Sequence, residues 1–103
     1  MRVRVKICCI KNAREVKLAV EYGADALGLV SAMPSGPGPI TDAEARSLAA
    51  IVPPPVSAFL LTSLQSARAI IAQQRQVRPG TLQIVDELTE GTYAELREAL
   101  PGI

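Results

Sequence analysis

The chain has 103 residues, of which 49% are hydrophobic and 3% aromatic, and its 11 basic and 10 acidic residues give a formal net charge of +1. This length suits a single domain over residues 1–103 with an aliphatic core. The balanced charge gives no reason to expect nucleic acid or an anionic membrane as a partner. No apolar run approaches the roughly 18 residues of a membrane span, and the first residues lack the apolar segment of a secretory signal.

Cysteine and histidine usage limits the chemistry that the chain can perform. Cys8 and Cys9 are adjacent and are the only two cysteines, and the sequence contains no histidine. Two adjacent cysteines do not form a disulfide framework, so we expect a reduced, cytoplasmic protein. We expect no metal site, because neighbouring residues of a strand point to opposite faces and the commonest metal ligand is absent.

Apolar segments typical of strands alternate four times with segments typical of amphipathic helices. The predicted strands cover residues 3–8, 25–30, 56–61 and 81–85. The predicted helices cover 13–22, 42–51, a segment after Ser63 that stops before Pro79, and a segment that opens at Thr89 or Thr92 and stops before Pro101. Such alternation predicts an α/β fold with parallel strands.

Capping residues mark the expected helix boundaries. Asn12 is a plausible N-cap for the first helix, and Gly23 would end it. Thr41 followed by Glu44 three residues later has the pattern of a capping box for the second helix. We expect Ser63 to cap the third helix.

Three architectures fit this alternation: a small doubly wound sheet, a flavodoxin-like sheet lacking a strand, and four units of a (βα)8 barrel. A doubly wound sheet is covered by helices on both faces and favours apolar strands. Here Arg4 and Lys6 share a strand face with Cys8, and Asp25 and Gln83 also fall on predicted strands. The mouth of a barrel accommodates such polar residues in compensating pairs, so these residues favour the barrel.

Two phrases of the sequence, VRVKIC at residues 3–8 and GADALGLV at residues 23–30, resemble the start of phosphoribosylanthranilate isomerase. A proline-bearing loop at residues 31–40, VPPPV at residues 52–56, and Leu82-Gln83-Ile84, which is similar to the family's Q-L-H segment, extend the resemblance over essentially the whole chain. The family is a (βα)8, or TIM, barrel enzyme of tryptophan biosynthesis. The resemblance therefore implies the (βα)4 N-terminal half of such a barrel.

The resemblance also implies a chemistry and a set of site residues. The family's Amadori rearrangement, of an aminoaldose to an aminoketose, uses a general acid and a general base and no cofactor or metal. The family's base aligns with Cys8, and Lys6 on the same predicted strand face would favour its thiolate. Lys6 and Gln83 are expected to bind the substrate. Gly38 stands where the family has a substrate-contacting arginine and completes the predicted substrate-binding positions.

Other features of the family have no counterpart in these residues. Its general acid and phosphate-binding loops would lie beyond Ile103, and Val85 replaces the histidine of the family's strand-four segment. Asp86 and Glu87 are candidate acids, although adjacent acidic residues after a strand commonly cap the next helix. We therefore expect weak or no turnover of a small sugar-phosphate substrate by the lone chain. The alternative is a non-catalytic half-barrel module.

A half-barrel would leave two unpaired sheet edges. Unpaired backbone N–H and C=O groups at an edge are a template for further strand pairing. We expect a homodimer or a higher homo-oligomer, in which strand four of each copy lies beside strand one of the other copy.

Overall fold

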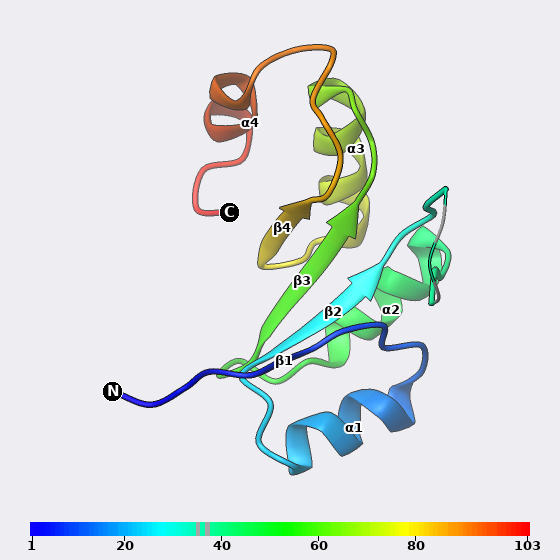
Figure 1. The fold of residues 1–103 in the computed structure, drawn as a ribbon, viewed down its shortest axis with the longest axis vertical. Coiled ribbons are helices and arrows are strands. Elements are labelled where there is room, and N and C mark those ends of the chain that lie inside the picture. The colour runs from blue at the N-terminus through cyan, green and yellow to red at the C-terminus, as the bar shows by residue number, and fades with distance from the viewer. Residues whose placement is uncertain (35, 37) are drawn as a thin grey trace.

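The computed structural model describes residues 1–34, 36 and 38–103, so Ser35 and Pro37 of the proline-bearing loop lie outside the described residues. It contains one four-stranded parallel sheet with four helices, in the order β1-α1-β2-α2-β3-α3-β4-α4 (Figure 1). The strands are β1 Lys6–Ile7, β2 Ala26–Val30, β3 Ser57–Thr62 and β4 Thr81–Ile84. The helices are α1 Ala13–Glu21, α2 Asp42–Ile51, α3 Ala67–Val77 and α4 Tyr93–Ala99.

The order of the strands distinguishes between the three expected architectures. The sheet runs β1-β2-β3-β4, so each strand pairs with the next strand of the chain. Doubly wound and flavodoxin-like sheets instead reverse their order at a switch point. A sequential parallel order is that of successive βα units in a barrel, and the chain therefore has the fold of half a (βα)8 barrel.

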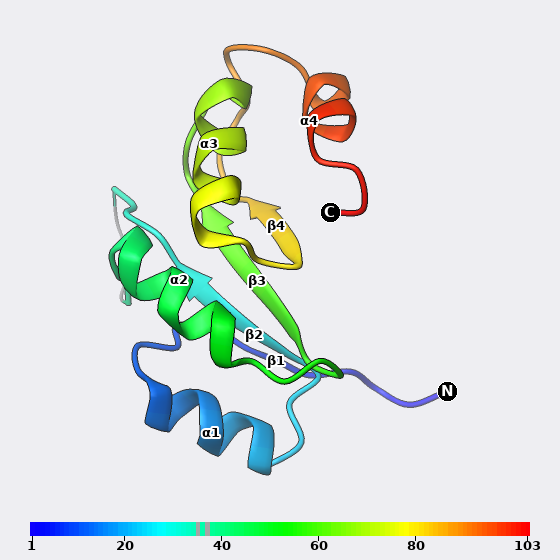
Figure 2. The ribbon, with the colours of Figure 1, turned by 180° about the vertical axis from the view of Figure 1, so that it is seen from behind.

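The helices cover one face of the sheet, as Figures 1 and 2 show from opposite sides. Leu27, Leu29 and Leu60 are fully buried in the layer between this face and the helices. They alternate with the residues of the opposite face, as a strand requires. Val16 of α1 and Ala45 and Leu48 of α2 pack into the same apolar cluster. The predicted aliphatic core thus lies between the sheet and the helices.

Three of the helix boundaries follow from the expected caps. The side chain of Asn12 accepts a hydrogen bond from the backbone N–H of Glu15, and Thr41 and Glu44 form the predicted capping box. Thr92, rather than Thr89, caps α4. These caps satisfy backbone donors that a helix N-terminus otherwise leaves without an intrahelical partner.

The predicted cap at Ser63 is wrong. The hydroxyl of Ser63 donates to the carbonyl of Ala32, 3.0 Å away, so it joins two loops at the ends of β2 and β3. Ser66 caps α3 instead and accepts a hydrogen bond from the N–H of Ala69 at 3.4 Å. Both serines precede the same apolar helical pattern. The tertiary contact of Ser63 with Ala32 shows that Ser63 has a different role from the helix cap.

The first strand is shorter than predicted, because only Lys6–Ile7 of residues 3–8 are strand. The N–H groups of Asp25 and Ala26 both donate to the carbonyl of Val5, so the chain stays attached to β2 just before the strand begins. β1 lies at the edge of the sheet and pairs with β2 alone in the described sheet. One ladder of hydrogen bonds constrains an edge strand less than the two ladders of a central strand.

Asp25 lies just before β2 rather than on the strand, and it fastens the N-terminal segment to the sheet. Its carboxylate accepts a hydrogen bond from the backbone N–H of Val5 at 2.8 Å and forms an ion pair with Arg2. The hydrogen bond from Arg2 and the one from Val5 lower the pKa of Asp25 from 3.8 to about 2. The position at the amino ends of the strands is the stabilising end of a barrel rather than its active-site end.

We expect Asp25→Asn to remove a pH-dependent part of the stability. Because the pKa of Asp25 is lowered on folding, its contribution is complete above about pH 4 and disappears as the pH falls through about 2. Chemical denaturation of both proteins at several pH values measures this. Their midpoints should differ at pH 6 and converge near pH 2, and a constant difference would contradict the assignment. Glu44, whose pKa is also lowered, is present in both proteins and cancels.

A smaller apolar cluster attaches α4 to the rest of the fold. Leu96 of α4 packs with Ala67 and Ile70 of α3, against partly buried Leu82 and Ile84 on β4. The loop before α4 is joined to the start of α3, because the N–H of Ala67 donates to the carbonyl of Glu90 at 2.8 Å. Gly91 then passes directly over Ala67 with a φ of +85°.

Candidate active site

The sheet face opposite the helices carries the polar residues that the sequence singled out. Lys6 of β1 is in register with Ala26, Gly28 with Phe59, and Leu61 with Gln83. These residues alternate with the leucines that face the helices, so their side chains project from the concave side of the sheet. In a barrel this side is the interior.

Lys6 and Gln83, which are predicted to bind substrate, meet on this face. The Lys6 ammonium donates a hydrogen bond to the side-chain oxygen of Gln83 and lies 4.9 Å from the centroid of the Phe59 ring. The two residues belong to the first and last strands, which would be about 14 Å apart in a flat sheet. The contact is possible because the sheet curves and its side chains converge on the concave side.

Phe59 is a residue that the sequence analysis did not identify. Its ring offers the Lys6 ammonium a cation–π contact, which contributes to holding the charge over the centre of the sheet. The sequence shows that Phe59 is the single phenylalanine of the chain. The sequence does not show the strand register, which places Phe59 on β3 between the strands of Lys6 and Gln83.

Cys8 immediately follows β1, at the end of the strand where barrel enzymes carry their active sites. Its side chain is exposed and lies against Gly28 of β2. A Cβ atom at position 28 would lie 2.7 Å from the sulfur of Cys8, so the thiol occupies space that any larger residue would take. Within the described residues, the Lys6 ammonium contacts Gln83 and the Phe59 ring rather than this thiol.

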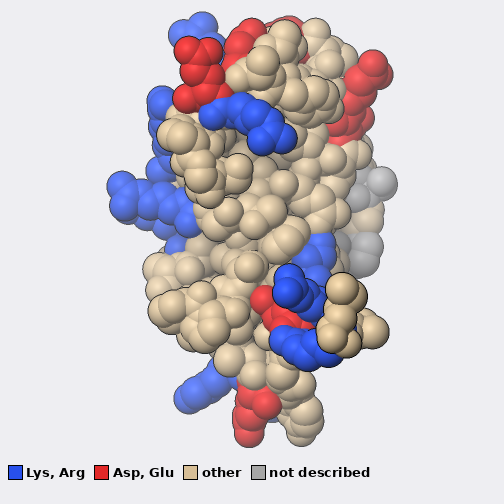
Figure 3. Space-filling model, turned by 90° about the vertical axis from the view of Figure 1, so that its left-hand side faces the viewer, with Lys and Arg blue, Asp and Glu red and all other residues tan. Residues whose placement is uncertain are grey.

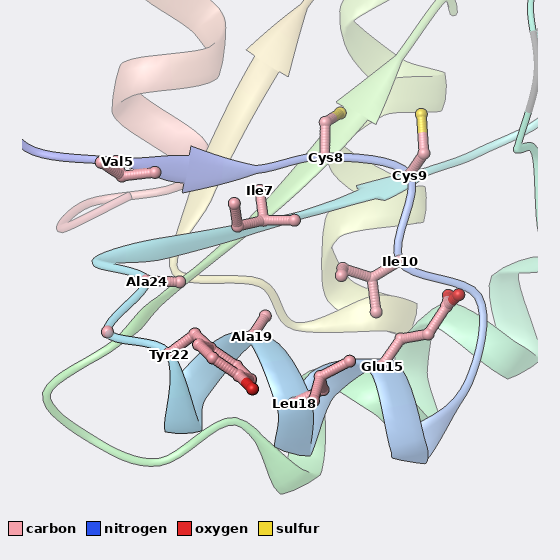
Figure 4. A pocket seen from close by; sticks show the side chains of 11 residues that line it. Val5, Ile7, Cys8, Cys9, Ile10, Glu15, Leu18, Ala19, Tyr22 and Ala24 are labelled. Carbon is pink, nitrogen blue, oxygen red and sulfur yellow. The ribbon is translucent and has the colours of Figure 1, made fainter.

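Cys9 does not point away from Cys8 as strand alternation predicted. Its backbone is left-handed, with a φ of +59°, and this turn brings its sulfur to the same side as that of Cys8, away from α1 (Figure 4). The N–H of Ile10 then resumes the attachment to β2 by donating to the carbonyl of Gly28 at 3.1 Å. A left-handed conformation is uncommon for residues other than glycine, and the resembled family has glycine at this position.

Burial raises the pKa of the Cys9 thiol. The neighbouring Cys8 raises that pKa further through its charge and through a hydrogen bond between the two side chains. The positive charge of Lys11 opposes these effects. The Cys9 thiol therefore stays protonated to higher pH than an ordinary cysteine thiol.

Gly38, the third predicted substrate-binding position, lies against Cys9 and not beside Lys6 and Gln83. A Cβ atom at position 38 would lie 2.9 Å from the Cβ of Cys9 and 3.2 Å from its sulfur, and the φ of Gly38 is +92°. An arginine here, as in the resembled family, would meet both a strained backbone and Cys9. Gly38 can therefore offer a ligand only its backbone groups.

Two apolar grooves open along the edges of the sheet, which sequence reasoning had not located. One has a volume of about 410 Å³ and lies between β1 and α1, where Ile7, Ile10 and Leu18 line it (Figure 4). The other has a volume of about 270 Å³ and lies between β4 and α4, where Leu82, Ile84 and Tyr93 are among the lining residues. Each groove follows an edge strand, which is where a further βα unit of a barrel would pack.

The candidate acids Asp86 and Glu87 lie in the loop after β4 and are exposed. The carboxylate of Asp86 accepts a hydrogen bond from the N–H of Glu87 at 2.9 Å, which is a local turn contact. Neither carboxylate has a described hydrogen bond with Lys6 or Gln83. This geometry is that of a loop-stabilising acidic pair.

Comparison with curated proteins identifies relatives of about twice this length. The chain is 37% identical over 87 residues to N-(5'-phosphoribosyl)anthranilate isomerase of Halorubrum lacusprofundi, which is 84% of the chain and 41% of that protein. It is 36% identical over 98 residues to the enzyme of the same name from Natronomonas pharaonis, which is 94% of the chain and 47% of that protein. The chain spans about half the length of the curated relatives it matches. No family model matches the chain.

Solved structures of the same kind match the fold. Phosphoribosyl anthranilate isomerase from Thermotoga maritima superposes with a TM-score of 0.77 at 28% identity, over 95% of the chain and 46% of that protein. A phosphoribosyl anthranilate isomerase in complex with reduced 1-(o-carboxyphenylamino)-1-deoxyribulose 5-phosphate superposes with a TM-score of 0.78 at 28% identity, over 95% of the chain and 48% of that protein. A third match, with a TM-score of 0.77 at 26% identity over 95% of the chain and 47% of that protein, is to monomers generated from the dimeric Thermotoga maritima enzyme. Among residues 1–34, 36 and 38–103, no helix is long and apolar enough to cross a membrane.

Proposed function

The chain is homologous to phosphoribosylanthranilate isomerases over about half of their length, and we propose that it is an N-terminal half-barrel module of that reaction. The observation that carries the proposal is the convergence of Lys6 and Gln83 over the concave face, with the Cys8 thiol at the active-site end of the adjoining strand. The reaction is an isomerisation of an aminoaldose to an aminoketose in tryptophan biosynthesis.

We assign the following roles within that reaction. Cys8 is the general base that removes the proton from C2 of the ring-opened substrate, because a thiolate at an exposed strand end can reach a bound sugar. Lys6 and Gln83 bind the substrate, since an ammonium and an amide suit the anionic and hydroxyl groups of a sugar phosphate. Gly38 contributes its backbone at the mouth of the site.

The half-barrel needs a second half for turnover. The described concave face offers a general base and substrate-binding groups. The reaction also needs a general acid and groups that bind the phosphate. A complementary βα segment along the two apolar grooves would close the sheet and supply both. The exposed Cys8 thiol is consistent with a reducing, cytoplasmic setting for this module.

Turnover of freshly prepared phosphoribosylanthranilate tests the proposal. The chain alone should show weak or no isomerisation, and adding the C-terminal half of a homologous isomerase should raise the rate at least tenfold over either half alone. The matched control is the same mixture with Gly28→Val, which places a side chain in the space of the Cys8 sulfur. No rate increase in a mixture that forms a complex would contradict the proposal.

A second copy of the chain is the partner that we propose for the isolated protein. Strand β4 of each copy would pair with β1 of the other, so both edges would be satisfied in a closed eight-stranded ring. Figure 3 views the side of the molecule that carries α4 and both termini, where charged side chains lie at both ends, along the left and in a cluster of both signs at the lower right, with uncharged side chains between them. The apolar grooves beside β1 and β4 are the surfaces that such pairing would bury.

We expect sedimentation velocity to show a homodimer at micromolar concentrations. Ile84→Lys, which places a charge in the groove beside β4, should shift the equilibrium towards monomer by at least tenfold in Kd. Glu21→Lys, at an exposed position near the end of α1, makes a matched control that should leave the equilibrium unchanged. A wild-type protein that stays monomeric across this range would overturn the dimer.

The open edges also support a second candidate function, a non-catalytic half-barrel module that self-associates. The two grooves favour this function independently of any chemistry on the concave face. The two candidates differ in one result. A dimer that forms without isomerase activity, alone or with a complementary half, would favour the structural module.

A further inference from the structure

We propose that Cys8 and Cys9 form a dithiol chelate for soft, thiophilic centres of the trivalent arsenical class. The inference starts from the backbone of Cys9, whose φ of +59° turns its sulfur to the side of the Cys8 sulfur. Adjacent cysteines in a regular strand would point to opposite faces and could not bind one small centre together. The left-handed residue therefore converts two separate thiols into one potential bidentate site.

A direct interaction between the two side chains supports this geometry. The sulfur atoms of Cys8 and Cys9 lie on the same side of the chain in Figure 4, and an interaction with the Cys8 side chain contributes to the raised pKa of Cys9. A ligand that bridges both sulfur atoms then needs little rearrangement, which makes the second bond effectively intramolecular. Thiolate sulfur is the side-chain donor that soft centres prefer.

The surroundings leave the pair open on one side, because Cys8 is exposed and Cys9 is half-buried. Glycine stands against each of them, Gly28 beside Cys8 and Gly38 beside Cys9, and a Cβ atom at either position would collide with the thiol or its side chain. Cys8 is exposed, so a ligand can approach from the open side of the sheet. Lys11 places a positive charge near Cys9, which partly offsets the effects that raise the pKa of this thiol.

The binding step is a condensation without a redox change. An organoarsenic dihydroxide has two As–O bonds, and each breaks as an As–S bond forms. The two thiol protons leave with the two hydroxides as two molecules of water, and arsenic remains trivalent. No oxidant, reductant or further ligand is required, which suits a chain that contains no histidine.

Phenylarsine oxide is the probe that tests this site, with intact-mass spectrometry and thiol titration as readouts. Wild-type protein should bind one arsenical per chain and lose both thiols that react in the titration, and the adduct should resist a monothiol but be reversed by a dithiol. Cys8→Ser and Cys9→Gly should each weaken binding by at least tenfold, on the order of a hundredfold. Cys9→Gly is a favourable variant because glycine adopts a φ of +59° without strain.

A two-thiol control separates chelation from cysteine content. The double variant Cys9→Gly, Glu21→Cys keeps two thiols but moves one to an exposed position on α1, away from Cys8. It should bind as weakly as Cys9→Gly alone. Equal affinity of wild type and either single-thiol variant, two arsenicals per wild-type chain, or tight binding by the displaced pair would each overturn the proposal. The chelate does not depend on isomerase activity, so its test stands apart from that of the proposed function.

Discussion

Cys8→Ala should lower the kcat of the isomerase reconstituted from this chain and a complementary half by at least a hundredfold. A positioned general base contributes roughly 10²–10⁴ to the rate, and alanine cannot accept a proton. The methyl group of alanine is smaller than the thiol, so it fits against Gly28 without moving β2. Steady-state kinetics on phosphoribosylanthranilate measures the effect.

The affinity for a bound sugar phosphate separates a base from a structural residue. If Cys8 acts in proton transfer, the variant should bind reduced 1-(o-carboxyphenylamino)-1-deoxyribulose 5-phosphate about as tightly as the wild-type complex does. Its kcat should fall, because an interaction made only in the transition state has been removed. Turnover that survives Cys8→Ala would discredit the base. A parallel loss of analogue binding would instead indicate that the thiol positions the loop at the mouth.

Gly91→Ala should destabilise the fold by about 3 kcal/mol, which is the sum of a strained backbone and an overpacked contact. The φ of Gly91 is +85°, a conformation that alanine adopts only with strain. A Cβ atom here would lie 2.6 Å from the Cβ of Ala67, which is fully buried at the first residue of α3. Neither partner can move far, because the N–H of Ala67 already bonds the carbonyl of Glu90.

Gly23→Ala is the matched control for this effect. Gly23 has a φ of +90°, and a Cβ atom there meets nothing within 4 Å, so the substitution causes backbone strain alone. We expect a loss of about 1 to 2 kcal/mol for Gly23→Ala, clearly smaller than that for Gly91→Ala. Urea denaturation of both variants at one protein concentration measures the difference. Equal losses would show that the contact with Ala67 does not limit position 91.

Much of the local structure could be predicted from the sequence because it depends on neighbouring residues. Asn12 and the Thr41–Glu44 box mark helix starts, since each satisfies donors only three residues away. Ser63 was misassigned because its partner, the carbonyl of Ala32, is distant in the sequence. The order of the strands, which distinguishes the barrel from a doubly wound sheet, likewise depends on pairing that no local pattern encodes.

In the candidate site, too, local features could be predicted from the sequence, whereas long-range contacts could not. Lys6 and Gln83 were expected on strands and as substrate-binding residues, and the structure brings their side chains together. Their bond requires the curvature of the whole sheet and the register that adds Phe59. Strand alternation predicted the wrong direction for the Cys9 side chain, because Cys9 has a left-handed backbone conformation. No pattern in the sequence indicates that conformation.

The sequential strand order also determines how the chain can fold during synthesis. Each strand pairs with the one made just before it, so the loop that must close for each pairing is short and its entropic cost is small. The units from β1 to β3 can therefore assemble while later residues are still being added. The bond between Lys6 and Gln83 joins residues 77 positions apart and cannot form before the fourth strand is in place. The polar contact at the centre of the candidate site therefore depends on the fourth strand, and hydrogen exchange during refolding should show the backbone amides of β4 protected after those of β2.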